Sequence, residues 1–487
     1  MLTPRQLMNI RKTKFVQPLS PQSCIFNDLQ APPDFSHRNQ NGLLLWTARN
    51  NSVTMNQFEF MNSRQKSGLP TLSLFSGAMG LDLGLEKQGF SIKVTVENNR
   101  AAVATIKQNR PDIAVIDRSI SNVCTNEILK EAKLEASEVV LISAGPCCQS
   151  FSTAGKRHSI EDPRGSLFYD FCRIVKEVRP RFFIMENVKG LLSAAVKHRP
   201  LNERGAGFPP LTKKEQLGSA LDLIRTELIN LNYHVMFEVL NAADFGVPQK
   251  RLRVIFIGSR DGEDIRLPRP TYADPKETTK KKLLPWVTLE KSIAGVVSEK
   301  WAEFSKERLA MLKMLGPGQN WRDLPKHLHR DALGAAADSW GGRVGFCRRL
   351  AWNEPAPTLT TAPNGRATTL CHPDQDRPLS VEEYAVLQQF PADWQFSGSI
   401  HQKYMQIGNA VPIGLGAAIG KELLRTMRRT AKYGLPADAA KRLGKVTCAD
   451  PQFEERLKKR KKTQLHPPHL RKISNAEETR KWLIASA

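Results

Sequence analysis

Apolar runs alternate with glycine turns and amphipathic stretches from residue 69 onward. The runs are rich in Val, Ile and Leu and have the length of buried strands, and segments with apolar residues at helical spacing separate them. We expect strands at 72–75, 92–97, 113–116, 139–143, 181–188, 235–240 and 254–258. We expect helices ending near Gln88, over 101–108, from Leu167, over 220–231 and over 379–390, the last capped by Ser380. This alternation predicts an α/β fold with a doubly wound sheet.

Two adjacent cysteines lie in the turn after the apolar run 139–143. Gly145 and Pro146 end that strand, so the cysteines follow at the carboxyl edge of the sheet, where open α/β sheets bind ligands. Small and hydroxyl neighbours and the basic loop that starts at Lys156 favour a thiolate nucleophile. A buried structural cysteine is the alternative, because free cysteines are often buried and inert.

A glycine-containing turn joins the first strand to the first helix. Gly77 and its neighbours would let a ligand approach the backbone and the helix amino terminus. Glu97 ends the next strand about 20 residues later, a spacing at which an acid can bind ribose hydroxyls. A surface glutamate would look the same in the sequence, so this pattern alone leaves both interpretations open.

The charge balance indicates a polyanionic partner. The 487 residues include 72 Lys and Arg against 48 Asp and Glu, a formal net charge of +24. Nucleic acid is the simplest partner for such a surplus, and solubility from surface lysines is the alternative. No apolar run approaches the ~20 residues needed to span a bilayer, and the amino terminus lacks the apolar core of a secretory signal. The eight cysteines form no C-x-x-C pair, which predicts a reducing cytoplasm and no zinc ribbon.

The segment 145–152 resembles the Gly-Pro-Pro-Cys-Gln-x-Phe-Ser signature of DNA cytosine-5 methyltransferases. In this alignment Cys148 takes the catalytic place and Cys147 replaces the usual second proline. The resemblance covers about residues 70 to 425 and keeps the order of the family's motifs. The further matching segments are 74–77, 186–188 (Glu-Asn-Val), 249–253 (Gln-x-Arg-x-Arg), 349–361 and 408–412. The implied fold is a methyltransferase-type, Rossmann-like doubly wound domain with a smaller target-recognition domain.

The resemblance also implies S-adenosylmethionine as the cofactor, without a metal. It implies that Phe75 stacks on the adenine, that Glu97 holds the ribose and that Asp117 holds the adenine edge. The other cofactor residues that it implies are Gly77, Pro146, Leu167, Asn409 and Ala410. Two departures are visible, since Ser73 stands where the family usually has Asp and Met79 where it often has Gly.

The implied catalytic residues are Cys148, Glu186 and Arg253. Cys148 would add to a flipped-out cytosine, Glu186 would grip that base, and Arg253 would face the nucleotide or its phosphate, with Arg251 structural. A buried acid such as Glu186 must be paired or protonated. The implied activity is methylation of carbon 5 of cytosine in a specific duplex sequence, in a restriction-modification system or by a solitary enzyme. A tRNA cytosine-5 methyltransferase and a non-catalytic DNA-binding relative are the alternatives.

We expect five regions along the chain. They are an N-terminal arm at 1–68, a catalytic domain at 69–260, a target-recognition domain at 261–345, its support and a returning helix at 346–430, and a basic tail at 431–487. The tail carries the charge run 458–462, which is either a solvated surface or a non-specific DNA contact. The expected partner is double-stranded DNA, with no membrane. The resemblance also allows a cognate restriction endonuclease, a monomer on DNA and a bacterial, nucleoid-associated cytoplasmic location.

Overall fold

The computed structural model describes residues 68–146, 167–200, 203–204, 207–278, 282–338 and 344–465. All of them belong to one unit of the chain. Cys147, Cys148 and the basic loop that starts at Lys156 lie outside the described residues, as does the predicted N-terminal arm up to residue 67.

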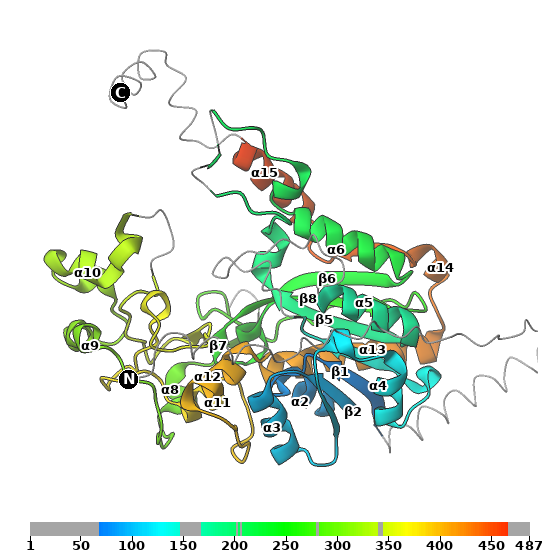
Figure 1. The fold of residues 1–487 in the computed structure, drawn as a ribbon, viewed down its shortest axis with the longest axis horizontal. Coiled ribbons are helices and arrows are strands. Elements are labelled where there is room, and N and C mark those ends of the chain that lie inside the picture. The colour runs from blue at the N-terminus through cyan, green and yellow to red at the C-terminus, as the bar shows by residue number, and fades with distance from the viewer. Residues whose placement is uncertain are drawn as a thin grey trace, which may run out of the picture. The chain divides into compact units, whose positions relative to one another are not determined.

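In the described part of the chain, eight strands form one central sheet in the order β12-β6-β8-β5-β4-β1-β2-β3 (Figure 1). Every neighbouring pair is parallel except those of β8, which runs antiparallel to β5 and β6. The strands are β1 (Leu69–Leu74), β2 (Phe90–Glu97), β3 (Ala114–Asp117), β4 (Leu141–Ala144), β5 (Phe182–Val188), β6 (His234–Asn241), β8 (Leu252–Ser259) and β12 (Lys445–Cys448). The mainly parallel order confirms the predicted α/β class, because helices must connect such strands.

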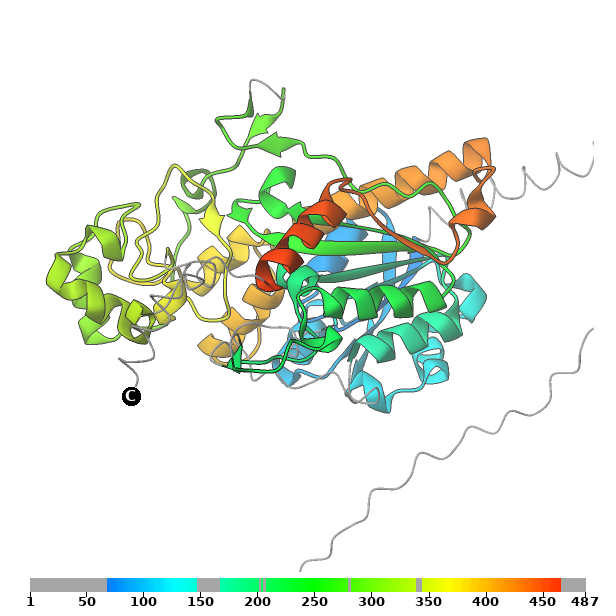
Figure 2. The ribbon, with the colours of Figure 1, turned by 90° about the horizontal axis from the view of Figure 1, so that it is seen from above.

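Helices cover both faces of this sheet (Figures 1 and 2). One face carries α4 (Thr125–Ala132), α5 (Leu167–Val178) and α6 (Ser219–Asn230), and the other carries α2 (Gly80–Glu86), α3 (Arg100–Asn109) and α13 (Ile413–Tyr433). Successive residues of β5 point to opposite faces of the sheet. Phe183 packs with α5 and α6 on one face, whereas Ile184 packs with α13 on the other. Both faces of the central strands are therefore buried, which explains why they read as continuous apolar runs.

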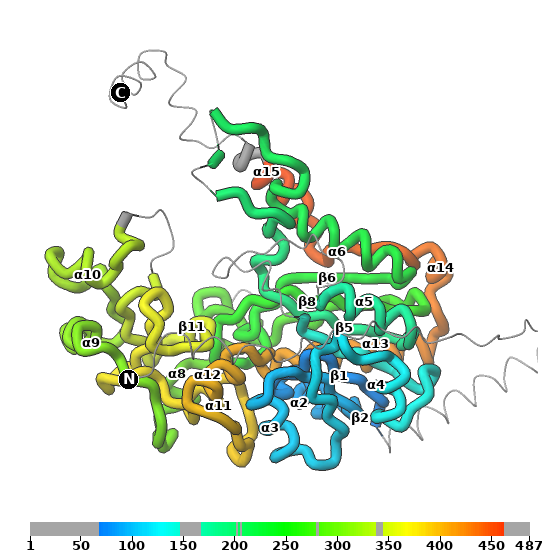
Figure 3. Tube along the Cα trace, in the orientation of Figure 1, coloured from blue at the N-terminus to red at the C-terminus, as the bar shows by residue number. Residues whose placement is uncertain are grey.

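A second group of short elements lies beside the sheet, away from α4 (Figures 1 and 3). These elements are β7 (Gln249–Lys250) paired with β11 (Ala356–Pro357), β9 (Tyr272–Ala273) paired with β10 (Leu284–Pro285), α8 (Leu289–Ile293), α9 (Lys306–Lys313), α10 (His329–Leu333), α11 (Val381–Leu387) and α12 (Ile400–Asn409). Arg349 is 4% exposed and donates hydrogen bonds to the carbonyls of Leu312 and His372. It thereby joins α9 to a later loop. The chain ends with α14 (Ala439–Arg442), β12 and α15 (Phe453–Leu465).

The predicted strands and helices are present, with bounds that differ by a few residues. The Ser380 cap is confirmed as a capping box, in which Ser380 and Glu383 accept hydrogen bonds from each other's backbone N–H. That helix ends at Leu387 and not at residue 390, because Gln389 has a left-handed backbone (φ 65°) and Pro391 follows. The predicted basic tail contributes the edge strand β12, which local apolar periodicity did not indicate.

Candidate active site

The turn into the cysteine loop lies directly against Glu186. Strands β4 and β5 are parallel neighbours, with Ala144 opposite Met185, so Gly145 and Glu186 follow at the same edge of the sheet. A Cβ atom added to Gly145 would lie 3.3 Å from Glu186 Oε2. The glycine therefore leaves room for the carboxylate beside the turn.

Arg253 is the charge partner of Glu186. Its Nε lies 2.7 Å from Glu186 Oε1, and the two side chains are only 11% and 12% exposed. The pair forms because β8 is antiparallel to β5 and places Arg253 opposite Val188, two residues beyond Glu186. Burial lowers the pKa of Arg253 and the Glu186 carboxylate opposes that shift. The sequence predicted that a buried Glu186 must be paired or protonated, and the structure shows it paired with Arg253.

Asn187 ties the same two strand ends together. Its Nδ2 donates to the Pro146 carbonyl at 3.1 Å, and its Oδ1 accepts from the Val188 N–H at 2.8 Å. The side chain is 5% exposed, so these bonds satisfy a buried amide. Asn187 was not among the residues singled out from the sequence, although it lies in the Glu-Asn-Val segment.

The residues around the β1–α2 turn also come together. Glu97 Oε2 accepts the Gly77 N–H at 2.8 Å, and Oε1 accepts the N–H groups of Asn98 and Asn99 at 2.9 and 2.8 Å. Phe75 has a positive φ of 59° and its N–H donates to Val96 at 2.9 Å. Non-glycine residues rarely adopt this backbone conformation, and such strained residues are found both at helix ends and at functional sites.

The other predicted cofactor residues lie at the end of β3, the start of α5, the end of α12 and the turn after β4. Asp117 ends β3 opposite Glu97 and is exposed. Leu167 begins α5 and is half-buried against the same apolar cluster as Phe75. Asn409 ends α12, and Ala410 then packs on α2, since a Cβ atom on Gly80 would lie 3.0 Å from the Ala410 Cβ. Pro146 is buried at the end of β4.

Residues 69–425 match the family model described as C-5 cytosine-specific DNA methylase. The chain belongs to this family. It is 35% identical over 370 residues to the type II methyltransferase M.Sau96I of Staphylococcus aureus, covering 76% of this chain and 78% of that protein. It is 36% identical over 367 residues to M.Eco47II of Escherichia coli, covering 74% of this chain and 80% of that protein. Among solved structures, a putative DNA modification methyltransferase from an E. coli prophage covers 74% of this chain and 99% of its own, with 24% identity and a TM-score of 0.49.

This cytosine-5 DNA methylase has a buried carboxyl group that sequence reasoning did not identify. Asp82 of α2 is 1% exposed and accepts hydrogen bonds from Ser73 of β1 at 2.8 Å and from Ser143 of β4 at 3.1 Å. Burial raises the pKa of Asp82 from 3.8 to about 7, although both hydrogen bonds lower it in part. The Asp82 carboxylate therefore links β1, which leads into the Phe75 turn, to β4, which leads into the cysteine loop.

Arg251 of the methylase has structural contacts. It is 1% exposed and donates to the carbonyls of Leu359 at 3.0 Å and Gly408 at 2.7 Å. Those carbonyls belong to two of the later motif segments, so the guanidinium holds the returning chain against the sheet. Burial lowers the pKa of Arg251.

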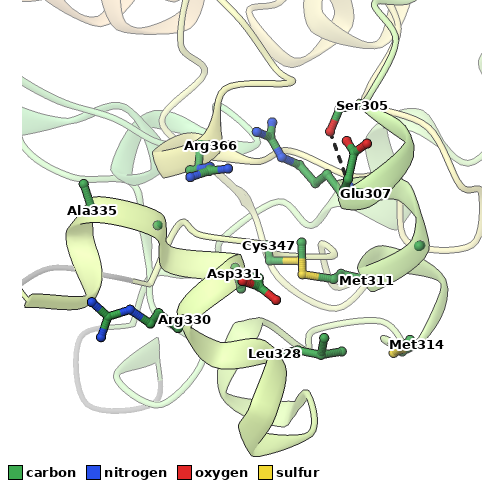
Figure 4. Close-up of a pocket in the computed structure, with 14 residues that line it drawn as sticks. Ser305, Glu307, Met311, Met314, Leu328, Arg330, Asp331, Ala335, Cys347 and Arg366 are labelled. Carbon is green, nitrogen blue, oxygen red and sulfur yellow. Dashed lines mark hydrogen bonds between the residues drawn. The ribbon is translucent and has the colours of Figure 1, made fainter.

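A separate cavity of about 810 Å³ lies between α9 and α10 of the methylase (Figure 4). Arg308, Arg330 and Arg366 line it together with apolar side chains such as Met311. Burial and the nearby Arg366 lower the pKa of Arg308. None of the predicted catalytic or cofactor residues within the described ranges lines this cavity.

In the ranges that the structure describes, no group of three or more His, Cys, Asp or Glu side chains could hold a metal ion. No helix among these residues is long and apolar enough to cross a membrane.

Proposed function

We propose that the methylase transfers a methyl group from S-adenosylmethionine to carbon 5 of a flipped-out cytosine in a specific duplex DNA sequence. The transfer would proceed through a covalent adduct of the base with Cys148. The observation that carries this proposal is the Glu186–Arg253 ion pair beside Gly145, because Cys148 follows Pro146 by two residues in the sequence. The Glu186 carboxylate, the Arg253 cation and the turn that leads to the Cys148 thiol therefore lie at the same edge of the sheet.

The chemistry of cytosine requires these groups. Carbon 5 is a poor nucleophile, and addition of the Cys148 thiolate to carbon 6 makes it enamine-like, which is covalent catalysis. Glu186 would accept a hydrogen bond from the exocyclic amino group and, once N3 carries a proton in the adduct, a second one from N3–H, which stabilises the adduct. Arg253 fixes the orientation of that carboxylate. After carbon 5 is methylated, a base removes its proton and the electron pair expels the Cys148 thiolate.

The target cytosine must leave the duplex, because its ring face is not reachable within the base stack. Extrusion costs a few kcal/mol of stacking and pairing, which contacts to the distorted backbone must offset. Arg253 and the basic loop that starts at Lys156 are the cations proposed for these contacts.

The turn around Phe75 fits S-adenosylmethionine. Beyond its two chain neighbours, no atom of the described residues lies within 4 Å of a Cβ atom added to Gly77, so the turn has open space beside it. Glu97 Oε2 accepts one hydrogen bond from the described residues, and a carboxylate oxygen can accept two. The bound cofactor would supply an electrophilic methyl group on a sulfonium sulfur. The residues proposed to hold it are Phe75, Gly77, Glu97, Asp117, Pro146, Leu167, Asn409 and Ala410.

The biological setting that we propose is modification of DNA. The similar proteins are named type II methyltransferases, which supports a role in a restriction-modification system or as a solitary methylase. We propose that the enzyme acts as a monomer on duplex DNA.

Trapping of the adduct tests the reaction and the nucleophile. Labelled S-adenosylmethionine and unmethylated genomic DNA first identify the modified cytosine, by bisulfite mapping. A duplex with 5-fluorocytosine at that position is then incubated with wild type, Cys148→Ser and Cys147→Ser. Fluorine cannot leave as a proton does, so a covalent complex should accumulate with wild type and Cys147→Ser and be absent with Cys148→Ser.

The other outcomes overturn parts of the proposal. Loss of trapping in Cys147→Ser alone would move the nucleophile by one residue. Trapping on structured RNA and never on DNA would identify an RNA methyltransferase. Absence of any adduct despite cofactor binding would indicate a non-catalytic relative.

A further inference from the structure

The described chain continues for 40 residues beyond the end of the family match, from 426 to 465. This continuation is part of the folded sheet, because β12 pairs in parallel with β6 from Lys445 opposite His234 to Cys448 opposite Phe237. The helix α15 follows and lies over α6 (Figures 1 and 2). The extension therefore adds a docked surface to the methylase.

Three kinds of contact fix α15 to α6 and to the neighbouring strand β6. The Phe453 ring meets Phe237 edge-on at 5.5 Å, and Leu457 is 6% exposed. Arg225 of α6 lies over the Phe453 and Phe237 rings and forms an ion pair with Glu454. These contacts hold the first half of α15 in place.

The direction of α15 follows from its ion pairs. Glu454 near its start pairs with Arg225 in the middle of α6, whereas Lys461 pairs with Asp222 in the first turn of α6 at 3.1 Å. The two helices are therefore antiparallel. Lys461 also reaches Gly218, the residue before α6, because a Cβ atom there would lie 3.0 Å from Lys461 Cε.

This direction takes the basic half of α15 toward the edge of the sheet that carries Glu186. The helix α6 connects β5 to β6, and both strands run antiparallel to β8, so they are parallel to each other. The start of α6 consequently lies at the edge where β5 ends. In Figure 1 the end of α15 extends toward the side of the molecule that carries α9 and α10.

Exposed cations collect at this place from two separate segments. We define the basic surface as Lys197, Lys213, Lys214, Lys458, Lys459 and Arg460, all of which are exposed. The Lys197 N–H donates to the Lys214 carbonyl at 2.9 Å, and this segment leads into Gly218, which Lys461 touches. Figure 1 shows the segment next to α15.

An ordinary helix-stabilising pattern accounts for only part of this charge. Acids in the first turn and cations in the last turn favour any exposed helix, and α15 has Glu454 and Glu455 at its start. That pattern does not explain the lysines of the 197–214 segment. Two acids of this region pair with cations outside the basic surface, Asp222 with Lys461 and Glu215 with Arg199.

We propose that the basic surface binds the phosphate backbone of duplex DNA outside the methylated sequence. The inference rests on the proposed DNA substrate and adds a contact whose α15 part lies beyond the family match. A helix of 13 residues is ~20 Å long, which corresponds to about 6 base pairs of flanking duplex. Such contacts are independent of sequence and strengthen binding through counterion release.

The test compares two triple variants with equal loss of charge. Lys458→Gln, Lys459→Gln and Arg460→Gln together remove three cations of the basic surface. The control carries Lys421→Gln, Arg428→Gln and Lys432→Gln, which are exposed on α13 at the opposite face of the sheet. Kd is measured over a range of salt for a minimal duplex with the mapped target and for one with about 10 additional base pairs on each side.

We expect the first variant to bind the long duplex about tenfold more weakly at low salt, with the slope of log K against log salt reduced by about 2 to 3. Binding of the minimal duplex and kcat at saturating DNA should match wild type, and the control should match wild type throughout. Equal losses on both duplexes, the same loss in the control, or no loss at all would each overturn the inference. Absence of methylation by wild type on any duplex would instead contradict the proposed function.

Discussion

The Ser73 hydroxyl donates a 2.8 Å hydrogen bond to the Asp82 carboxylate, which is 1% exposed. Ser73 stands where the resemblance to the family leads one to expect an aspartate. The structure thus has a carboxylate at this place, but it comes from the helix α2 and not from the strand β1. Ser143 donates to the other oxygen of the same carboxylate, so the arrangement also includes the strand that leads to the cysteine loop.

This arrangement predicts a pH-dependent stability. Burial raises the pKa of Asp82 from 3.8 to about 7, so the folded state holds this proton more tightly than the unfolded state does. The stabilisation is complete below pH ~4 and is lost as the pH rises toward 7. Asp82→Asn should remove this loss of stability, which amounts to up to about 4 kcal/mol. The melting temperature of the variant should therefore rise relative to that of wild type as the pH increases from about 5 to 8.

The charged neighbours of Asp82 set the control for that experiment. Glu86 raises the pKa of Asp82 and Arg110 lowers it, and these two residues form an ion pair of 2.6 Å. Arg110→Gln should therefore raise the pKa of Asp82 further and extend the loss of stability to higher pH. A difference between Asp82→Asn and wild type that stays constant over this pH range would contradict the assignment.

Loss of the Glu186 charge should separate chemistry from stability. Glu186→Gln leaves the buried Arg253 without its counter-charge and replaces one of the two carboxylate oxygens proposed for the target base with an NH2 donor. We expect kcat for methyl transfer to fall by at least about 100-fold, with the Kd of the cofactor unchanged. Tritium transfer at saturating substrate and calorimetric cofactor titration measure the two quantities.

A second buried ion pair provides the matched control. Arg181 and Glu263 are 2.6 Å apart and lie away from the predicted site residues. Glu263→Gln should lower the free energy of unfolding by about 3 kcal/mol without the loss of kcat. If both variants lose kcat alike, Glu186 acts only through folding.

Gly145→Ala tests the space beside Glu186. Among the described residues, the new Cβ would meet Glu186 Oε2 alone, at 3.3 Å, so the carboxylate must move by a few tenths of an ångström. We expect kcat to fall about tenfold, because small displacements of catalytic groups are costly, while stability changes by less than about 1 kcal/mol.

Gly258→Ala is the contrasting change. Its Cβ would lie 2.1 Å from the Phe183 ring, in a core that cannot yield easily. Thermal unfolding should show a loss of at least about 2 kcal/mol, larger than that of Gly145→Ala. The reverse order of stabilities would show that the turn at Gly145 is packed more tightly than the structure indicates.

Met79→Gly tests the second departure from the family pattern. Met79 has a left-handed backbone (φ 66°) but a side chain that is 0% exposed and packs on Ile92 and Ile106. The glycine relieves about 1 kcal/mol of backbone strain and removes a buried side chain worth about 2–5 kcal/mol. Chemical denaturation should therefore show a net loss of about 1–4 kcal/mol.

Lys133→Gly has the same backbone effect without the buried side chain. Lys133 caps the carboxyl end of α4 with φ 54° and is exposed. This variant should be stabilised by up to about 1 kcal/mol. Loss of stability in Lys133→Gly would mean that strain relief does not contribute in the way assumed for Met79.

Local patterns were enough to predict much of the framework. Strand β2 alternates apolar and polar residues up to Glu97, strand β5 begins with an apolar run that Glu186 follows, and the Ser380 cap has its partner three residues later. These signals are carried by adjacent residues, so they can be read without knowledge of the fold. The edge strand β12 has a half-exposed, polar sequence, and for that reason periodicity did not indicate it.

The sequence by itself determined the α/β class, the order of the motifs and the candidate residues Glu186, Arg253 and Glu97. Only the tertiary structure decided which of these groups touch: that Glu186 pairs with Arg253, that Asp82 stands in for a carboxylate at Ser73, and that α15 docks on α6. Each of these contacts joins residues far apart in the chain. Their burial and charge pairing arise when the strands take their order in the sheet, and no local pattern encodes that order.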